Sequence, residues 1–380
     1  MIPRKIFTPE HDEFRRTVKR FMEQEVMPQH PRWEEQQHVD REIFQRAGEL
    51  CLLCLTLPEE FGGVGVDRIF SAIVMEEQTY AGASGPGFSV HSDIVANYIA
   101  NFGTLAQKQQ WLPKMAAGTA IGAVAMSEPG TGSDLQAIAT RAVKDGDDYV
   151  LNGSKIFITN GYLSDIVVVV ARTGDSGEGS RDLSLILVEA GREGFTKAKP
   201  LQKIGMKAQD TCELNFANVR VPRSNLLGDA EGQGFKQLMR ELAWERLIIA
   251  ILSVAGAQAA LRHTLEYTRS RKVFGQAVAS FQNSRFKLAE MKAQIEIGQV
   301  FVDRCLEEEV AGKLTPEAAA AAKLWTSELV CRVVDEGLQL HGGYGYMLEY
   351  PIAKAWVDSR ASRIYGGTNE IMKELIARTL

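Results

Sequence analysis

A glutamate lies within the apolar stripe of the longest helical segment that the sequence predicts. The stripe consists of Leu238, Leu242, Glu245, Ile249 and Leu252, which recur at the spacing of one α-helical face. A bundle that buries this face also buries the carboxylate, and burial raises the pKa of a carboxyl group. Such a carboxylate can serve as a general base at neutral pH. Because Arg246 follows directly, the spacing alone also fits, and slightly favours, a structural ion pair.

A second chemical feature is a glycine-containing segment over residues 127–134, directly after an expected strand. Gly130 and Gly132 flank a hydroxyl residue, so backbone N–H groups and side-chain donors suit a phosphate or the polar edge of a ring. Further on, Phe157 and Thr159 offer an aromatic face and a hydroxyl on one side of a strand, which suits a stacked isoalloxazine ring. Taken singly, the glycine segment is more typical of an ordinary turn. Neither a P-loop nor a GxGxxG motif occurs, so a nucleotide cofactor must bind another way.

The segments that would position these groups predict an α+β protein of three domains. Residues 1–119 are expected to form an N-terminal helical domain, with caps at Thr8, Asp40, Asp67 and Thr104. Residues 120–228 are expected to form a middle β domain, a barrel or sandwich, because β-rich runs alternate with turn residues. Within it, Asn152-Gly153 predicts a two-residue hairpin turn.

The last domain, residues 229–380, is expected to be a four-helix bundle. Its periodic segments, at about 234–270, 280–312 and 316–340, are too long for ordinary surface helices and indicate antiparallel packing. Glu245 would lie on the first of them. The predicted architecture therefore carries the candidate base on a buried bundle helix.

The composition excludes several classes of protein. Of 380 residues, 45% are hydrophobic, and 43 Lys+Arg against 48 Asp+Glu give a net charge of −5, which disfavours nucleic acid as a partner. No transmembrane segment or signal peptide is expected, so we predict a cytoplasmic enzyme, or one of the mitochondrial matrix if a targeting segment was removed. Cys51 and Cys54 lack a second pair or clustered histidines, so they are interpreted as buried cysteines, and no metal site is expected.

Five ordered motifs resemble the acyl-CoA dehydrogenase family over essentially the whole chain. They begin at Met126, Asn152, Arg271, Gln339 and Ile364 and read MSEPGTGSD, NGSKIFITNG, RKVFG, QLHGG and IYGGTNE. The resemblance implies the same helix, strand, helix order. It also implies an FAD enzyme that oxidises an acyl-CoA thioester to its trans-2-enoyl-CoA.

The resemblance further implies which residues bind FAD. Around the flavin ring these are Met126, Ser127, Ser133, Phe157, Ile158 and Thr159. The adenosine and pyrophosphate would be reached across a subunit contact, and the implied residues are Arg271, Phe274, Gln282, Gln339, Leu340, His341, Gly342, Gly343, Thr368, Asn369 and Glu370. Because the site is shared between subunits, a homotetramer built as a dimer of dimers is expected.

One departure from the family pattern bears on the mechanism. Much of the family carries its catalytic base at the position that is Gly366 here, so this loop cannot supply the base. The long-chain and isovaleryl-CoA branches place a glutamate before an arginine on the long helix, as in Glu245-Arg246. Glu245 is therefore predicted to remove a Cα proton while a hydride leaves Cβ for the flavin. The backbone N–H of Gly366, with a ribityl hydroxyl of FAD, would stabilise the developing enolate.

The resemblance extends to substrate and partners. It is strongest to the long-chain branch, so long or methyl-branched acyl chains are favoured, and an electron-transfer flavoprotein is the expected electron acceptor. The implied substrate contacts are Ser133, Leu242, Arg246, Gly366 and Gly367. Three alternatives remain open: an acyl-CoA oxidase of the same fold, a desulfinase-type elimination without net oxidation, and a flavin-free helical scaffold.

Overall fold

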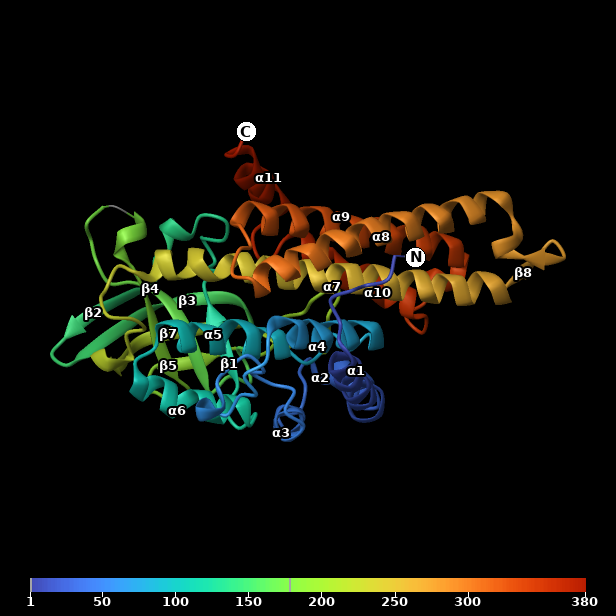
Figure 1. Ribbon diagram of the computed structural model, residues 1–380. Coiled ribbons are helices and arrows are strands. Elements are labelled where there is room, and N and C mark those ends of the chain that lie inside the picture. Colours follow the sequence, from blue (N-terminus) through green and yellow to red (C-terminus); the bar gives the residue numbers. More distant parts are fainter. Residues whose placement is uncertain (1, 178) are drawn as a thin grey trace.

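The computed structural model describes residues 2–177 and 179–380, and its elements follow the predicted helix, strand, helix order (Figure 1). The first group of helices is α1 (Pro9–Phe21), α2 (His30–Gln36), α3 (Glu42–Glu49), α4 (Arg68–Ala81), α5 (Ala96–Phe102) and α6 (Leu105–Ala116). The strands of the sheet are β1 (Gly122–Ala125), β2 (Arg141–Asp145), β3 (Asp148–Thr159), β4 (Ile166–Arg172), β5 (Leu183–Glu189), β6 (Phe195–Lys197) and β7 (Thr211–Pro222). The last group is α7 (Gly234–Ser270), β8 (Lys272–Val273), β9 (Gln276–Ala277), α8 (Gln282–Val310), α9 (Pro316–His341), α10 (Pro351–Ser359) and α11 (Asn369–Ala377).

Side-chain caps start several of the N-terminal helices. The carboxylate of Asp67 accepts the Ile69 N–H at the start of α4, and the Thr104 hydroxyl accepts the Gln107 N–H at the start of α6. The predicted cap at Asp40 is wrong, because α3 begins one residue later, with Arg41 in the cap position. The carboxylate of Asp40 instead accepts a hydrogen bond of 3.0 Å from the indole of Trp33.

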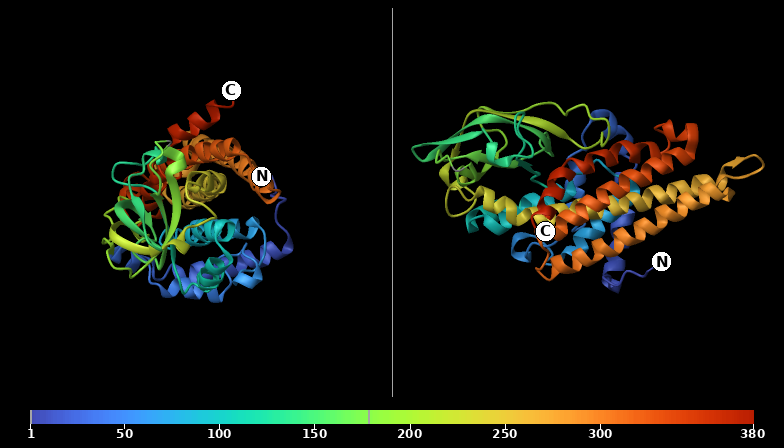
Figure 2. Two further views of the ribbon diagram at one scale, coloured as in Figure 1. Left: turned by 90° about the vertical axis from the view of Figure 1, so that its left-hand side faces the viewer. Right: turned by 90° about the horizontal axis from the view of Figure 1, so that it is seen from above.

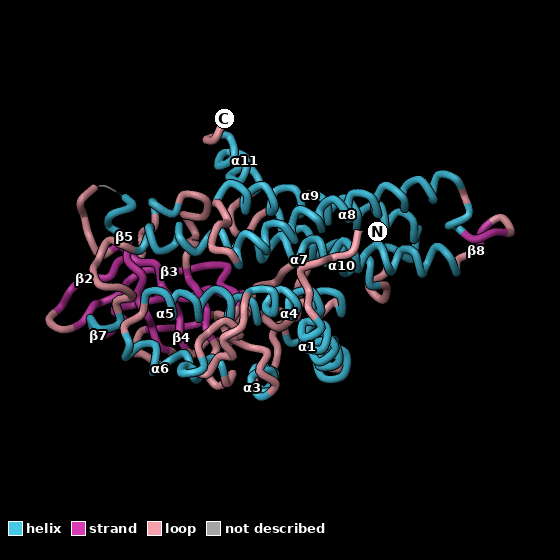
Figure 3. The backbone as a smooth tube through the Cα atoms, in the orientation of Figure 1, coloured by secondary structure: helices cyan, strands magenta, loops and turns pink. Residues whose placement is uncertain are grey.

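Strands β1–β7 gather at one end of the molecule, and the β8–β9 hairpin lies at the other end; Figure 3 draws both in magenta. In the described chain, β1–β7 form one mixed sheet in the order β1-β4-β2-β3-β7-β6, with β5 paired to β4. Apolar side chains from β4, β5 and β7 fill the interior of this domain, and β1 pairs in parallel with β4. The glycine-containing segment directly follows β1, so the strand fixes where that segment starts.

The hairpin turn predicted at Asn152-Gly153 is wrong. Strand β3 runs through both residues, and the two-residue turn between β2 and β3 is Gly146-Asp147, where Gly146 has a φ of 62°. Gly153 is needed for another reason, since a Cβ there would lie 2.4 Å from the Thr140 hydroxyl oxygen. Its neighbour Asn152 pairs with Asn218 across a register shift between β3 and β7. Close sheet packing therefore overrides the local turn preference.

Helix α7 is the central axis of the fold, as Figures 1 and 2 show from three directions. It is 37 residues long and packs against α4 on one side and against α8 and α9 on the other, with α10 completing the C-terminal helical bundle. By length and composition it is the one described helix that could cross a membrane, but 67% of its apolar window is buried in the protein. Its apolar character is that of a core helix.

The prediction that both early cysteines are buried is confirmed for Cys54 and wrong for Cys51. All five cysteines are free thiols, and Cys51 is exposed. Both residues have positive φ angles in the turns between α3 and α4, so the chain turns Cys51 outward while Cys54 enters the core. Among the described residues, no group of three or more His, Cys, Asp or Glu side chains could hold a metal ion.

Candidate active site

Glu245 faces the interior of the protein from the first third of α7. It is 8% exposed, and Leu238, Leu242 and Ile249 on the same helix face are also buried. The hydroxyl of Tyr98, on α5, donates a 2.8 Å hydrogen bond to Oε1 of Glu245. Burial raises the pKa of the Glu245 carboxyl to about 7, with the Tyr98 hydrogen bond opposing the rise and the charge of Glu241 adding to it. The carboxylate therefore exchanges its proton near neutral pH.

Arg246 does not form the ion pair with Glu245 that the sequence also allowed. No hydrogen bond, and no nitrogen–oxygen contact within 4 Å, joins the two side chains in the structure of residues 2–177 and 179–380, although the two charges still interact at longer range. The guanidinium is buried, and its Nε has no acceptor. Burial lowers the pKa of Arg246. The charge of Arg246 therefore lowers the pKa of Glu245, although the guanidinium does not bind its carboxylate.

The loop that follows α10 brings Gly366 against α7. Gly366 has a φ of 65°, and a Cβ at this position would lie 2.2 Å from Cδ1 of Ile249, one turn after Glu245. A buried ammonium holds the loop from α9: Lys323 Nζ donates hydrogen bonds of 2.8 Å to the carbonyl of Gly367 and to Oδ1 of Asn369. Only the backbone of residue 366 therefore lies next to the base. Cδ1 of Ile249 occupies the space that a Cβ at this position would need.

We expect Gly366→Ala to destabilise the protein by about 1–3 kcal/mol, because a non-glycine residue is strained at positive φ, and the contact with Ile249 adds to that strain. Ile249→Val removes only the Cδ1 methyl group and should cost about 0.5–1.5 kcal/mol alone. The double variant lacks the contact. Its loss of unfolding free energy should therefore be smaller than the sum of the losses of the two single variants. Denaturant unfolding of the two single variants and the double variant measures this coupling, and strict additivity would contradict the contact.

Two of the predicted flavin segments lie side by side in the middle domain. The Ile156 N–H donates to the Ser127 carbonyl at 3.0 Å, and the fully buried Lys155 donates to the Met126 carbonyl at 3.0 Å and to Glu128 at 2.9 Å. Glu128 in turn accepts the N–H groups of Ala139 and Thr140. These bonds fix the glycine-containing segment against β3.

The side chains expected to meet a flavin ring differ in exposure. Phe157 is 65% exposed and has a φ of 63°, so a strained backbone holds an aromatic ring in solvent. Ser133 is exposed, Met126, Ser127 and Thr159 are half-buried, and Ile158 points into the sheet core. Ile158 can therefore offer a cofactor its backbone, whereas the exposed face of Phe157 is free to stack.

The residues expected at the adenosine end form a separate cluster. Arg271 lies over the ring of Tyr344, which follows Gly342 and Gly343, and His341 stacks on Tyr267 at the end of α7. Phe274, in the β8–β9 hairpin, is 96% exposed. The rest of this cluster consists of Gln282, Gln339 and Leu340, of which Leu340 is half-buried.

This cluster and Glu245 are far apart in one chain. The α7 residues from Glu245 to Ser270 span about 38 Å at the rise of an α-helix. Figure 1 accordingly shows β8 at the opposite end of the molecule from the sheet. Within one subunit the two sets of residues therefore belong to two different sites.

The Thr368-Asn369-Glu370 segment has internal partners. The Thr368 hydroxyl caps α11, and the buried amide of Asn369 is bonded to Ser327, Glu328 and Lys323. Glu370 is exposed. Of the three, Asn369 is committed to holding the loop, so Thr368 and Glu370 remain the accessible candidates for a ligand.

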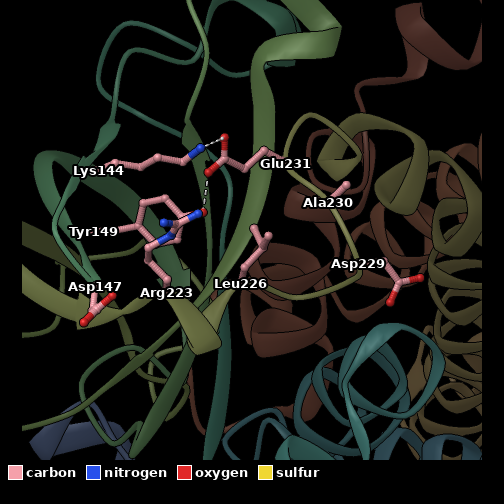
Figure 4. A pocket seen from close by; sticks show the side chains of 8 residues that line it. All are labelled: Lys144, Asp147, Tyr149, Arg223, Leu226, Asp229, Ala230 and Glu231. Atoms are coloured by element: carbon pink, nitrogen blue, oxygen red, sulfur yellow. Dashed lines mark hydrogen bonds and ion pairs between the residues drawn. The ribbon is translucent and has the colours of Figure 1, made fainter.

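A surface hollow of about 500 Å³ lies elsewhere, between the sheet and the start of α7 (Figure 4). It is lined by Lys144, Asp147, Tyr149, Arg223, Leu226, Asp229, Ala230 and Glu231. Lys144 forms an ion pair with Glu231, and the Tyr149 hydroxyl donates a hydrogen bond to the same carboxylate. None of the predicted site residues lines this hollow.

Three buried polar residues of the site were not singled out from the sequence: Tyr98, Lys155 and Lys323. Lys155 stands inside a quoted motif, but its type alone gave no reason to expect a fully buried ammonium. Tyr98 and Lys323 carry no spacing or composition that marks them. Only the tertiary structure brings Tyr98 to Glu245 and Lys323 to the Gly366 loop.

The fold thus places a buried carboxylate of raised pKa on its central helix, next to a loop that has glycine at residue 366. Family models of the acyl-CoA dehydrogenase N-terminal, middle and C-terminal domains match residues 8–119, 123–219 and 232–380. The mitochondrial long-chain specific acyl-CoA dehydrogenase of Rattus norvegicus is 52% identical over 378 residues, which cover 99% of this chain and 88% of that protein.

Solved structures agree with the family models. An acyl-CoA dehydrogenase from Geobacillus kaustophilus superposes with a TM-score of 0.97 at 44% identity, covering 99% of both chains. A glutaryl-CoA dehydrogenase from Mycobacterium smegmatis, solved in complex with FADH2, gives a TM-score of 0.92 at 29% identity over 98% of this chain and 95% of that one. The chain belongs to the acyl-CoA dehydrogenase family, a family of FAD-dependent enzymes, and the expected three-domain fold is confirmed.

Proposed function

We propose that this protein catalyses the α,β-dehydrogenation of an acyl-CoA thioester to its trans-2-enoyl-CoA, with Glu245 as the base. The observation that carries the proposal is a buried carboxylate whose pKa is raised to about 7, opposite a loop that has glycine at residue 366. A base works best when its pKa is close to the working pH. Since Gly366 has no carboxylate, Glu245 is the group that accepts the Cα proton.

The residues of the two predicted flavin segments fit FAD. The exposed ring of Phe157 offers a stacking face, and the segment after Ser127 is fixed beside it by the buried Lys155. Bound there, FAD supplies the acceptor for the hydride that leaves Cβ. Thr159 and Ser127 would offer hydroxyls to the ring edge, and Ser133 and Gly367 are the residues proposed to contact the CoA ester.

The adenosine end of FAD is assigned to a second subunit. The cluster of Arg271, Phe274 and His341 is about 38 Å of helix away from Glu245, so it cannot reach the same flavin from within one chain. The nearly complete exposure of Phe274 is consistent with burial against another copy. A homotetramer built as a dimer of dimers would bring this cluster to the flavin of a second subunit and would bury the Phe274 ring.

Enolate charge that develops on the thioester oxygen requires a donor aimed at it. The Gly366 N–H takes this role, because the loop lies against α7 next to the base and glycine keeps the N–H while it removes the side chain. Lys323 holds the following carbonyl and Asn369, so the donor is fixed before the substrate binds. Leu242 and Arg246 complete the wall beside Glu245.

Long or methyl-branched acyl chains are the proposed substrates. Two observations support this choice: the 52% identity to a long-chain specific relative, and the absence of a loop carboxylate near the reacting carbons. We expect turnover on palmitoyl-CoA or a methyl-branched CoA ester to exceed turnover on octanoyl-CoA. A clear optimum at butyryl-CoA would contradict the proposal.

An electron-transfer flavoprotein is the proposed acceptor of the electrons. Assays with such an acceptor and with oxygen separate the dehydrogenase from an oxidase, because only the oxidase releases peroxide in every turnover. Failure of any acyl-CoA to bleach the flavin without oxygen would favour an elimination reaction. The cytoplasm, or the mitochondrial matrix, remains the predicted compartment.

A further inference from the structure

Three hydrogen bonds join the segment before and within α5 to the turn of α7 that carries the base. The Tyr98 hydroxyl donates to Glu245, the Asn101 amide donates to Glu241 at 2.9 Å, and the Trp244 indole donates to the Asp93 carbonyl at 3.1 Å. The Asp93 carbonyl belongs to a π-helical turn, Val90–Val95, that runs directly into α5. A π-turn widens the helix and changes the direction of the residues that follow it, and such turns are frequent at functional sites.

Tyr98 is 0% exposed, so its hydroxyl has no water to bind and needs a protein partner. It uses a carboxylate oxygen, which makes the hydrogen bond charge-assisted when Glu245 is ionised. In the described chain this is the one hydrogen bond that the Glu245 side chain accepts, and it reaches Oε1. The second oxygen, Oε2, accepts no hydrogen bond from the described residues.

We propose that Tyr98 is a positioning residue for the base: its hydroxyl holds Oε1 of Glu245 so that Oε2 is presented to the acyl Cα–H. This inference rests on the proposed function of Glu245. A carboxylate rotates freely unless one oxygen is fixed, and a reacting group that is already oriented loses less entropy on reaching the transition state. In the transfer itself, the Cα–H bond breaks, Oε2 gains the proton, and the electron pair left on Cα forms the Cα=Cβ double bond as a hydride leaves Cβ; bound FAD would supply the acceptor for that hydride.

Two residues next to the base shift the pKa of Glu245 in opposite directions. Tyr98 stabilises the ionised carboxylate and lowers the pKa of Glu245, whereas the negative charge of Glu241, one helical turn earlier, raises it. The charged groups around this pair come from four helices: Arg240 and Arg246 on α7, Arg68 on α4, Glu309 on α8 and Lys323 on α9. None of these charged groups donates a hydrogen bond to Glu245 in the described chain, whereas Tyr98 does.

The test compares pH profiles for anaerobic reduction of the flavin by palmitoyl-CoA. The base must be ionised, so the rate of the wild-type protein rises with pH through the pKa of Glu245. Tyr98→Phe removes a hydrogen bond to the charged form and should move this inflection up by about one pH unit. Its plateau should fall about tenfold, because Oε2 is no longer held in place. Glu241→Gln should move the inflection down.

Tyr80→Phe is the matched control. Its hydroxyl donates a 2.7 Å hydrogen bond to Gln258, a neutral partner away from the base, so its profile should superimpose on that of the wild type. Opposite shifts for Tyr98→Phe and Glu241→Gln are a result that general loosening of the core would not produce. An unshifted inflection in Tyr98→Phe would overturn the proposal.

Glu245→Gln separates this inference from the function on which it rests. If that variant reduces as fast as the wild type, the assignment of the base is wrong and the role of Tyr98 falls with it. If it is inactive while Tyr98→Phe matches the wild type, only the positioning role is wrong. Infrared difference titration of the wild type against Glu245→Gln reads the Glu245 carboxyl without turnover, and Tyr98→Phe should raise that midpoint as well.

Discussion

Glu245→Gln is expected to slow flavin reduction by acyl-CoA by about 10²–10⁴-fold, the usual contribution of a general base. Glutamine has nearly the same shape as glutamate, and its amide oxygen can still accept the Tyr98 hydroxyl, so the packing of α7 should not change. It cannot accept the Cα proton. The rate is measured by rapid mixing of the oxidised protein with palmitoyl-CoA in the absence of oxygen.

Glu241→Gln provides the control for this result. It makes the same chemical change one turn earlier on α7, at a buried glutamate that is bonded to Asn101. At high pH, where Glu245 is fully ionised, this variant should reduce at close to the wild-type rate. Both variants should keep their flavin and bind acyl-CoA. Wild-type reduction by Glu245→Gln would remove Glu245 from the mechanism.

The features that follow from the helical periodicity of apolar residues were predicted correctly from the sequence. The three long helices of the bundle were expected at about 234–270, 280–312 and 316–340, and they lie at Gly234–Ser270, Gln282–Val310 and Pro316–His341. The burial of Glu245 followed from the same regularity, because one helix face carries the core residues along its whole length. Local turn chemistry was less reliable. Asn152-Gly153 has the composition of a tight turn, but the contact of Gly153 with Thr140 keeps it inside β3.

The partners of the base could not be predicted from the sequence. Tyr98 and Glu245 are 147 residues apart, and no spacing relates residues on α5 to residues on α7 before the helices pack. The same holds for Lys323, whose ammonium reaches Gly367 and Asn369 from another helix. Sequence motifs point to residues that contact a ligand. The residues that hold them in place become visible only in three dimensions.

Lys155→Met is expected to give the largest loss of stability, about 3–5 kcal/mol, because it leaves one charge of a buried pair without its partner. Lys155 is fully buried and bonded to Glu128, whose side chain is also buried. Burial lowers the pKa of the Lys155 ammonium to about 8 against the opposing pull of Glu128, so the lysine is still charged at neutral pH. Denaturant unfolding of the wild type and the variant measures the loss.

The loss should extend to the flavin, because the Lys155 ammonium also binds the Met126 carbonyl at the start of the glycine-containing segment. Without it, that segment is no longer fixed to β3, and FAD should dissociate more readily. Lys155→Met/Glu128→Gln removes the unpaired charge and should recover part of the stability, but not the flavin affinity, since Met126 stays unbound. Arg220→Met, which breaks surface ion pairs with Asp145 and Asp148 on the same sheet, is the control and should change neither property by much. Equal recovery of stability and flavin affinity in the double variant would mean that Lys155 acts only by neutralising Glu128.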